Sequence, residues 1–168
     1  KHLGEVLQDL QDLDMLFVNF CCGKNQITDD GFIHMSESIK DLSGLTNLRV
    51  NMCGGDNMIT DDGAKAFALA VENLPNLNFL LIKLCCNKNK VGEEGHVALS
   101  KSLTELKYLV SLTIATSGEH LNDQVCEYMA ESFFTLNNLR ELTVGLYENA
   151  ITNEGVEKLG KALGVMSQ

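Results

Sequence analysis

Acidic side chains recur at fixed places in this sequence, and they are the first residues that could do chemistry. The corresponding segments are Thr28-Asp29-Asp30, Thr60-Asp61-Asp62, Gly92-Glu93-Glu94 and Thr152-Asn153-Glu154. Acids at the start of a helix accept hydrogen bonds from free N–H groups and oppose the positive end of the helix dipole, with the threonine hydroxyl as a cap. The alternative is a row of calcium sites, although the spacing does not resemble the oxygen ligands of known calcium loops.

Six cysteines follow the same recurrence, at positions 21, 22, 53, 85, 86 and 126. Cys21, Cys53 and Cys85 occupy equivalent places on adjacent predicted strands, which lie about 5 Å apart in a sheet. A tetrahedral zinc site needs four converging ligands, whereas side chains in such a row diverge. We therefore expect buried or half-buried structural thiols, with a redox or metal role as the alternative. Cys126 is on a predicted helix, and we expect it to lie in the protein core.

No catalytic site can be assembled from the remaining reactive side chains. The histidines at 2, 34, 96 and 120 share no repeat position, and none pairs with a cysteine or serine in a recognisable nucleophile motif. The sequence therefore predicts that the protein is not an enzyme. It predicts no catalytic residue, no metal, no cofactor and no small-molecule substrate.

An asparagine followed two residues later by an apolar side chain marks the most regular feature of the chain. Asn25, Asn57, Asn89 and Asn149 begin this motif, and its closing positions 31, 63, 95, 125 and 155 lie 32, 32, 30 and 30 residues apart. Such a period is typical of a solenoid. Turns between repeats would otherwise bury unpaired polar groups, so we expect the four asparagines to form a structural ladder. Each would bond backbone groups of its turn and of the next repeat.

Each repeat has two halves with different hydrophobic periods. The first half reads like Leu13-x-x-Leu16-x-Val18-x-Phe20, and this alternation predicts a short strand with one face in the core. The second half carries apolar residues four apart, as at Phe67 and Val71, which predicts an amphipathic helix. Strands one repeat apart must lie side by side and parallel, with the helices stacked as a second layer.

A leucine-rich strand, an asparagine turn, acids followed by glycine and a full helix resemble the leucine-rich repeat, and the helix length resembles its ribonuclease-inhibitor-like subclass. The resemblance implies a right-handed curved α/β solenoid with a parallel β-sheet on the concave side and α-helices on the convex side. The repeats exceed the usual length of about 20 to 29 residues. We treat residues 1–168 as a single array of about five repeats and as a segment of a longer protein, because residues 1–10 match the helix half of an earlier repeat.

Outward strand residues must face the hollow side of such an array. They include large apolar groups with polar and basic neighbours, a mixture typical of partner surfaces, although neighbours within the sheet could cover some of them. The predicted partner-binding residues are Phe17, Asn19, Arg49, Asn51, Phe79, Leu81, Lys83, Thr113, Thr143 and Tyr147.

Members of the resembled family include inhibitors, innate sensors, ciliary scaffolds and a GTPase-activating protein, so the family alone does not fix a function. We expect a protein–protein interaction module or scaffold that binds a protein partner through the concave strand face. One alternative is a structural spacer in a large assembly, such as a ciliary or cytoskeletal complex. The second is a GTPase-activating or sensor-type regulatory domain.

The composition argues against other classes of partner. The 13 basic residues against 23 acidic ones argue against nucleic acid, which needs clustered lysine and arginine. No apolar run approaches the roughly 18 residues of a membrane span, so we expect no membrane association. A repeat core does not need disulfides, and the chain has no Asn-x-Ser/Thr glycosylation site, so we expect a cytoplasmic, intracellular protein.

The fourth repeat departs from the pattern of its neighbours. Glu119 replaces the ladder asparagine, Val125 replaces the glycine, Thr116 occupies an apolar slot, and the loop is two residues shorter. Each change removes a local support. We therefore expect the array to open first at this joint, with residues 112–116 less protected than residues 80–84.

Overall fold

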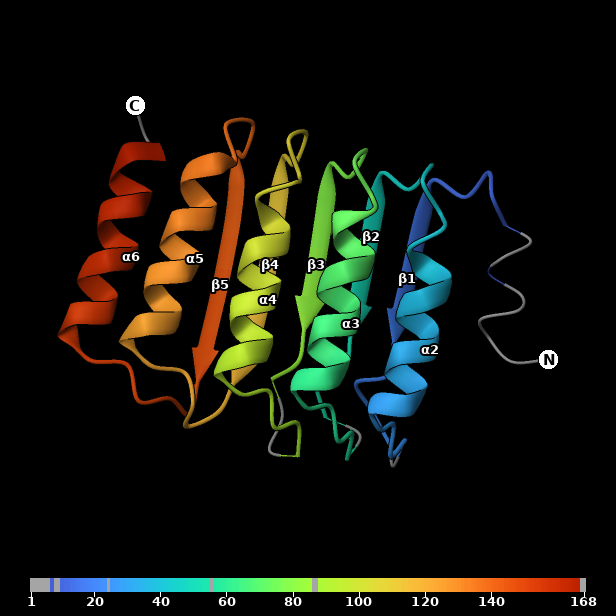
Figure 1. Cartoon of the computed structure of the whole chain (residues 1–168), viewed down its shortest axis with the longest axis horizontal. Coiled ribbons are helices and arrows are strands. Elements are labelled where there is room, and N and C mark those ends of the chain that lie inside the picture. The colour runs from blue at the N-terminus through green and yellow to red at the C-terminus, as the bar shows by residue number, and fades with distance from the viewer. Residues whose placement is uncertain (1–6, 8–9, 24, 55, 86–87, 167–168) are drawn as a thin grey trace.

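Strands and helices alternate along the chain in the computed structural model, which describes all residues except 1–6, 8–9, 24, 55, 86–87 and 167–168 (Figure 1). The helix predicted over residues 1–10 lies mostly outside the described residues, although Leu7 is helical and buried. The elements are β1 (Met15–Asn19), α2 (Asp29–Ile39), β2 (Asn47–Asn51), α3 (Asp61–Glu72), β3 (Phe79–Lys83), α4 (Glu93–Leu103), β4 (Ser111–Ser117), α5 (Asp123–Thr135), β5 (Glu141–Tyr147) and α6 (Asn153–Met166).

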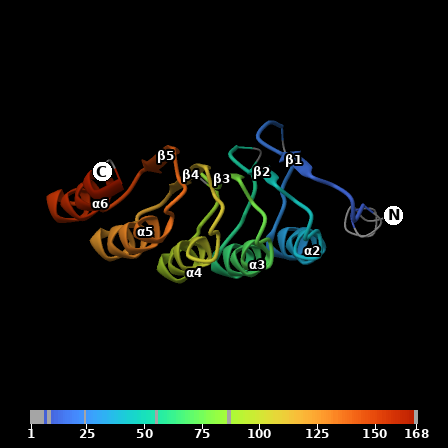
Figure 2. The same ribbon diagram turned by 90° about the horizontal axis from the view of Figure 1, so that it is seen from above.

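The five strands form one parallel sheet in the order of the sequence, and the register places equivalent residues of successive repeats side by side. The helices cover one face of this sheet and leave the other face open. Figure 2 shows the helices on the outer, convex side of the curved array and the strands on the inner side. The structure therefore confirms the predicted α/β solenoid.

The core is a ribbon between the sheet and the helices, as expected when each repeat packs only on its neighbours. Inward strand residues such as Leu48, Leu80 and Leu112 are at most 1% exposed. The helices contribute the predicted residues four apart, and the rings of Phe32 and Phe67 stack with centroids 5.5 Å apart. In α6 the equivalent Leu163 is 45% exposed, so the ribbon is open on that side within the described residues.

The acids at the helix starts join adjacent repeats. The Asp29 carboxylate accepts hydrogen bonds from the backbone N–H groups of Thr60 and Gly63, at 2.8 and 3.1 Å, and from the Thr60 hydroxyl. Thr28 and Thr60 form no side-chain cap bond to their own helices, so the predicted threonine caps are wrong at these positions. The same inter-repeat cap recurs from Gly92 and Gly95 to Asp61, and from Thr152 and Gly155 to Asp123.

Two of the asparagines form a ladder between repeats. Asn57 Oδ1 accepts the N–H of Ile27 in the preceding repeat at 3.1 Å, and the Asn57 amide donates to the carbonyl of Phe20 at 3.3 Å. Asn89 likewise accepts the N–H of Ile59 at 2.9 Å. Both asparagines are at most 5% exposed. The ladder thus points to the preceding repeat rather than to the next one, and it satisfies backbone groups that would otherwise be buried without partners.

Asn25 and Asn149 bond only backbone groups of their own turns among the described residues. For Asn149 the predicted bond to a neighbouring repeat is absent because the equivalent donor, the N–H of Leu121, is already bound to the carbonyl of Gly118 in the shortened turn of the fourth repeat. The ladder is therefore interrupted at that repeat, where the sequence has Glu119.

Candidate partner-binding face

Three strands present a compact set of outward side chains on the open face of the sheet. Parallel pairing without slippage arranges them as a grid, in which Arg49 lies between Phe17 and Leu81 across the strands. Phe17 and Met15 are 56% and 53% exposed. We call this grid the β1–β3 patch, and its members are Met15, Phe17, Asn19, Asn47, Arg49, Asn51, Phe79, Leu81 and Lys83.

The Arg49 guanidinium is fixed at the centre of this patch. Its Cζ atom lies 4.4 Å from the centroid of the Phe79 ring, a cation–π contact, and its Nε–H donates to Asn47 Oδ1 at 3.1 Å. Asn47 precedes Arg49 by two residues on β2, so alternation places both side chains on the open face. Neither Arg49 nor Lys83 forms an ion pair with any residue that the structure describes.

The other predicted binding residues continue the same face toward β5. Thr113 and Thr143 follow Leu81 in the central row, and Tyr147 lies at the far edge with 55% of its surface exposed. The structure brings together the seven predicted residues of β1–β3 and places Thr113 directly beside Leu81, whereas Thr143 and Tyr147 lie one strand farther away on β5. The outward neighbours of Thr113 on the intervening strand β4 are small, and Ser111 and Ala115 are buried.

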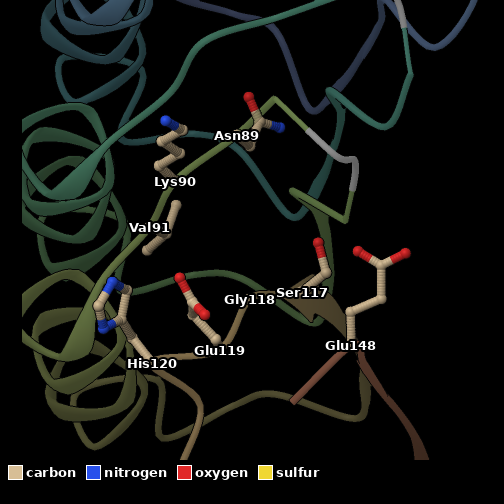
Figure 3. A pocket seen from close by; sticks show the side chains of 8 residues that line it. All are labelled: Asn89, Lys90, Val91, Ser117, Gly118, Glu119, His120 and Glu148. Carbon is tan, nitrogen blue, oxygen red and sulfur yellow. The ribbon is translucent and has the colours of Figure 1, made fainter.

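A second hollow, which the sequence did not reveal, lies beside the joint of the third and fourth repeats. Figure 3 shows Ser117 and Glu148 on one side of it and Val91 and Glu119 on the other. The two missing loop residues and the change to Glu119 were the signals that could have found it. Its volume is about 500 Å³, and the lining residues are Asn89, Lys90, Val91, Ser117, Gly118, Glu119, His120 and Glu148.

Inside this joint the fourth repeat has supports that its sequence pattern did not show. Thr116 is 1% exposed, and its hydroxyl oxygen lies 2.7 Å from Nε2 of the buried His96. The Asn122 side chain caps α5 by accepting the N–H groups of Gln124 and Val125, each at 3.0 Å. The expectation that Thr116 weakens the core is therefore wrong in its premise, because its polar group has a buried partner.

Comparison with known proteins supports the fold and nothing finer. No protein-family model and no curated protein sequence matches the chain. Among solved structures it is similar to one described as "Leiomodin-1 Actin-Binding Site 2 (ABS2)", with a TM-score of 0.63 and 13% identity over 98% of this chain and 87% of that one. The fold is a leucine-rich-repeat solenoid. At this identity the likeness shows the fold alone.

In this leucine-rich-repeat solenoid Cys21, Cys53 and Cys85 each follow the end of a strand by two residues, and Cys126 lies in the core. Cys21 and Cys22 place their sulfurs 3.3 Å apart, Cys21 and Cys85 are half-buried, and Cys22 is exposed. Cys126 lies in the core as predicted, and burial raises the pKa of its thiol. Cys86 lies outside the described residues.

No group of three or more histidine, cysteine, aspartate or glutamate side chains among the described residues is arranged to hold a metal ion. None of the described helices is both long enough and apolar enough to cross a bilayer.

Proposed function

We propose that this chain is a non-enzymatic protein-interaction module that binds a protein partner through the concave strand face, chiefly through the β1–β3 patch. The observation that carries the proposal is the exposure of Phe17 and Met15, above half for each side chain, beside the fixed Arg49 on an open sheet. Apolar side chains with a rim of polar and basic groups are characteristic of interaction surfaces.

Two further observations support the proposal. The structural neighbour is described as an actin-binding site, so the same fold presents a protein-binding surface in that protein. The helices here contain 11 to 14 residues, which supports the ribonuclease-inhibitor-like subclass among leucine-rich repeats. We also propose an intracellular location, in keeping with the lack of an Asn-x-Ser/Thr glycosylation site in the sequence.

Affinity capture with paired variants tests the proposal against the spacer alternative. The variant Phe17→Ala/Leu81→Ala truncates the patch, and Leu69→Ala/Phe134→Ala is the matched control because these residues are 56% and 47% exposed on helices α3 and α5. We expect a partner that binds the native chain and the control to be lost from the patch variant. Circular dichroism verifies that both variants are folded. If the patch variant retains every partner, the strand face is not the binding surface and a spacer role is favoured.

A further inference from the structure

The β1–β3 patch differs in charge from the rest of the molecule. The whole chain has a formal net charge of −10, yet the charged members of the patch are Arg49 and Lys83, both cations. Many of the acids lie in the first turns of helices, where they face the dipole rather than the open sheet. The patch is thus a basic and apolar surface on an acidic protein.

Arg49 is prepared to bind an anion. The contact with Phe79 and the bond to Asn47 orient the guanidinium plane, so little side-chain entropy remains to be lost when a ligand binds. Its other N–H donors have no acceptor among the described residues, and a guanidinium matches a carboxylate with two parallel bonds. Phe17 and Leu81 flank it in register and lower the local dielectric constant once a partner covers them, which strengthens the ion pair.

We propose that the partner of this face is an acidic peptide segment that also carries aromatic or aliphatic side chains. One carboxylate of this segment pairs with Arg49, a second acidic residue lies toward Lys83, and apolar side chains cover Phe17 and Leu81. This inference rests on the proposed function and adds the chemistry of the partner. It also fixes the direction in which the segment lies across the sheet, because Glu141 on β5 would repel an acidic residue at that end of the face.

The test is a selection of peptides from a random display library against the whole chain, followed by binding measurements with labelled synthetic peptides. We expect the selected sequences to be enriched in aspartate or glutamate next to aromatic or aliphatic residues. Fluorescence anisotropy should show binding at least about tenfold weaker for Arg49→Glu and for Lys83→Glu. Arg49→Lys should give an intermediate loss, because lysine keeps the charge without the planar fork.

Lys107→Glu is the matched control, since Lys107 is an exposed cation in the connection between α4 and β4 rather than on the open face. It should bind the selected peptides as the native chain does. A single-stranded oligonucleotide of thymidines provides a second anionic probe and should not compete with the peptides.

Three results would overturn the proposal, and they separate it from the proposed function. One is that selected peptides lose affinity for Phe17→Ala and keep it for Arg49→Glu and Lys83→Glu. This result would support the interaction face and contradict the acidic partner. Peptides whose affinity is the same for every patch variant would contradict both the interaction face and the acidic partner. If the oligonucleotide displaces the peptides when both are present at an equal concentration of negative charge, the patch is a general anion site rather than a peptide site.

Discussion

The Nε2 atom of His96 lies 2.7 Å from the hydroxyl oxygen of Thr116, and both side chains are buried beneath the sheet. The other ring nitrogen, Nδ1, lies 2.6 Å from the carbonyl oxygen of Gly92. Because a carbonyl only accepts hydrogen bonds, Nδ1 carries the hydrogen of the neutral ring and Nε2 accepts from the Thr116 hydroxyl. One buried polar group thus satisfies another in the slot where neighbouring strands place an apolar side chain.

The first prediction concerns the hydroxyl of this pair. Thr116→Val keeps the volume but leaves Nε2 of His96 buried without a donor, so we expect a loss of about 1 to 3 kcal/mol in the free energy of unfolding. Urea denaturation followed by circular dichroism measures it. The double variant His96→Leu/Thr116→Val should recover part of the loss, because both partners are then apolar. A Thr116→Val variant as stable as the native chain would show that the hydrogen bond contributes nothing.

The second prediction is a pH dependence that comes from the same histidine. Burial lowers the pKa of His96 below its ordinary value of 6.5, because desolvation disfavours the imidazolium. In the unfolded chain His96 takes up a proton as the pH falls through 6.5, while the folded chain does not until a lower pH. The contribution of His96 to the free energy of unfolding should therefore be constant above about pH 7.5 and should fall as the pH decreases toward about 5.5.

Thermal unfolding of the native chain and of His96→Leu at several pH values isolates this contribution. His34 and His120 remain in both proteins, so the difference between their pH profiles belongs to His96 and its neighbours. Identical profiles would mean that His96 titrates alike in the folded and unfolded chains.

The sequence predicts the backbone organisation well because every repeat encodes it again. The change of period from two to four residues within each unit fixes the strands and helices, and recurrence fixes their parallel order. The partnership of His96 and Thr116 could not be predicted, because the two residues are 20 positions apart and neither side chain recurs in other repeats. The hydrogen bonds from the next repeat to the Asp29 carboxylate were also not predicted, because helix-cap rules consider only a helix and its own flanking residues.

The third prediction follows from the close approach of Gly63 to Asp29. A Cβ at Gly63 would overlap Oδ1 of Asp29, whereas a Cβ at Gly31 would meet, among the residues that the structure describes, only Ile27 Cγ2, at 3.4 Å. Alanine usually stabilises a helix relative to glycine by about 1 kcal/mol. We therefore expect Gly31→Ala to be neutral or stabilising and Gly63→Ala to be destabilising, measured by urea denaturation.

The cause of the Gly63→Ala effect can be isolated by a double-mutant cycle. In the background of Asp29→Ala the overlap is removed, so the cost of Gly63→Ala should shrink or change sign. An unchanged cost would assign the effect to Ile59 and Phe32, whose side-chain atoms also lie 3.0 and 3.2 Å from the added carbon. It would exclude the inter-repeat cap as the reason for glycine at this position.

The fourth prediction concerns the titration of Asp123. The hydroxyl of Thr152, followed by the Thr152 backbone N–H, holds the pKa of Asp123 below its ordinary value of 3.8. The bonds favour the charged carboxylate, so their contribution to stability is present above pH 3.8 and is lost as the pH falls through the folded-state pKa. Thr152→Val should raise this pKa, measured by carbon NMR of the carboxylate. No change would show that the hydroxyl does not hold the charged form.

The candidate binding face was predicted in part for the same reason as the fold. Strand alternation identifies which residues face the hollow side, so the ten predicted residues lie on that face. The orientation of Arg49 over Phe79 depends on a diagonal contact between strands 30 residues apart in sequence, and no pattern within one repeat encodes it. The hollow lined by Glu119 and Glu148 likewise depends on how two unequal turns meet.

The last prediction locates the part of the array that opens first. The sequence favoured strand residues 112–116, but β4 pairs with β3 over five residues and with β5 over seven, and Thr116 has a buried partner. The turn beside them differs. Among the described residues the Leu121 N–H is bonded only to the carbonyl of Gly118 within the same turn, whereas the Ile59 N–H is bonded to the buried Asn89 side chain of the next repeat.

Native-state hydrogen exchange should therefore find the Leu121 amide much less protected than that of Ile59, while the strand amides of β4 match those of β3. Asn89→Ala removes the acceptor of the Ile59 N–H, so it should bring the protection of Ile59 toward that of Leu121. The site of opening would then follow from the missing ladder asparagine rather than from a weak strand. Equal protection of Leu121 and Ile59 in the native chain would contradict this, because the interrupted ladder would then have no effect on local opening.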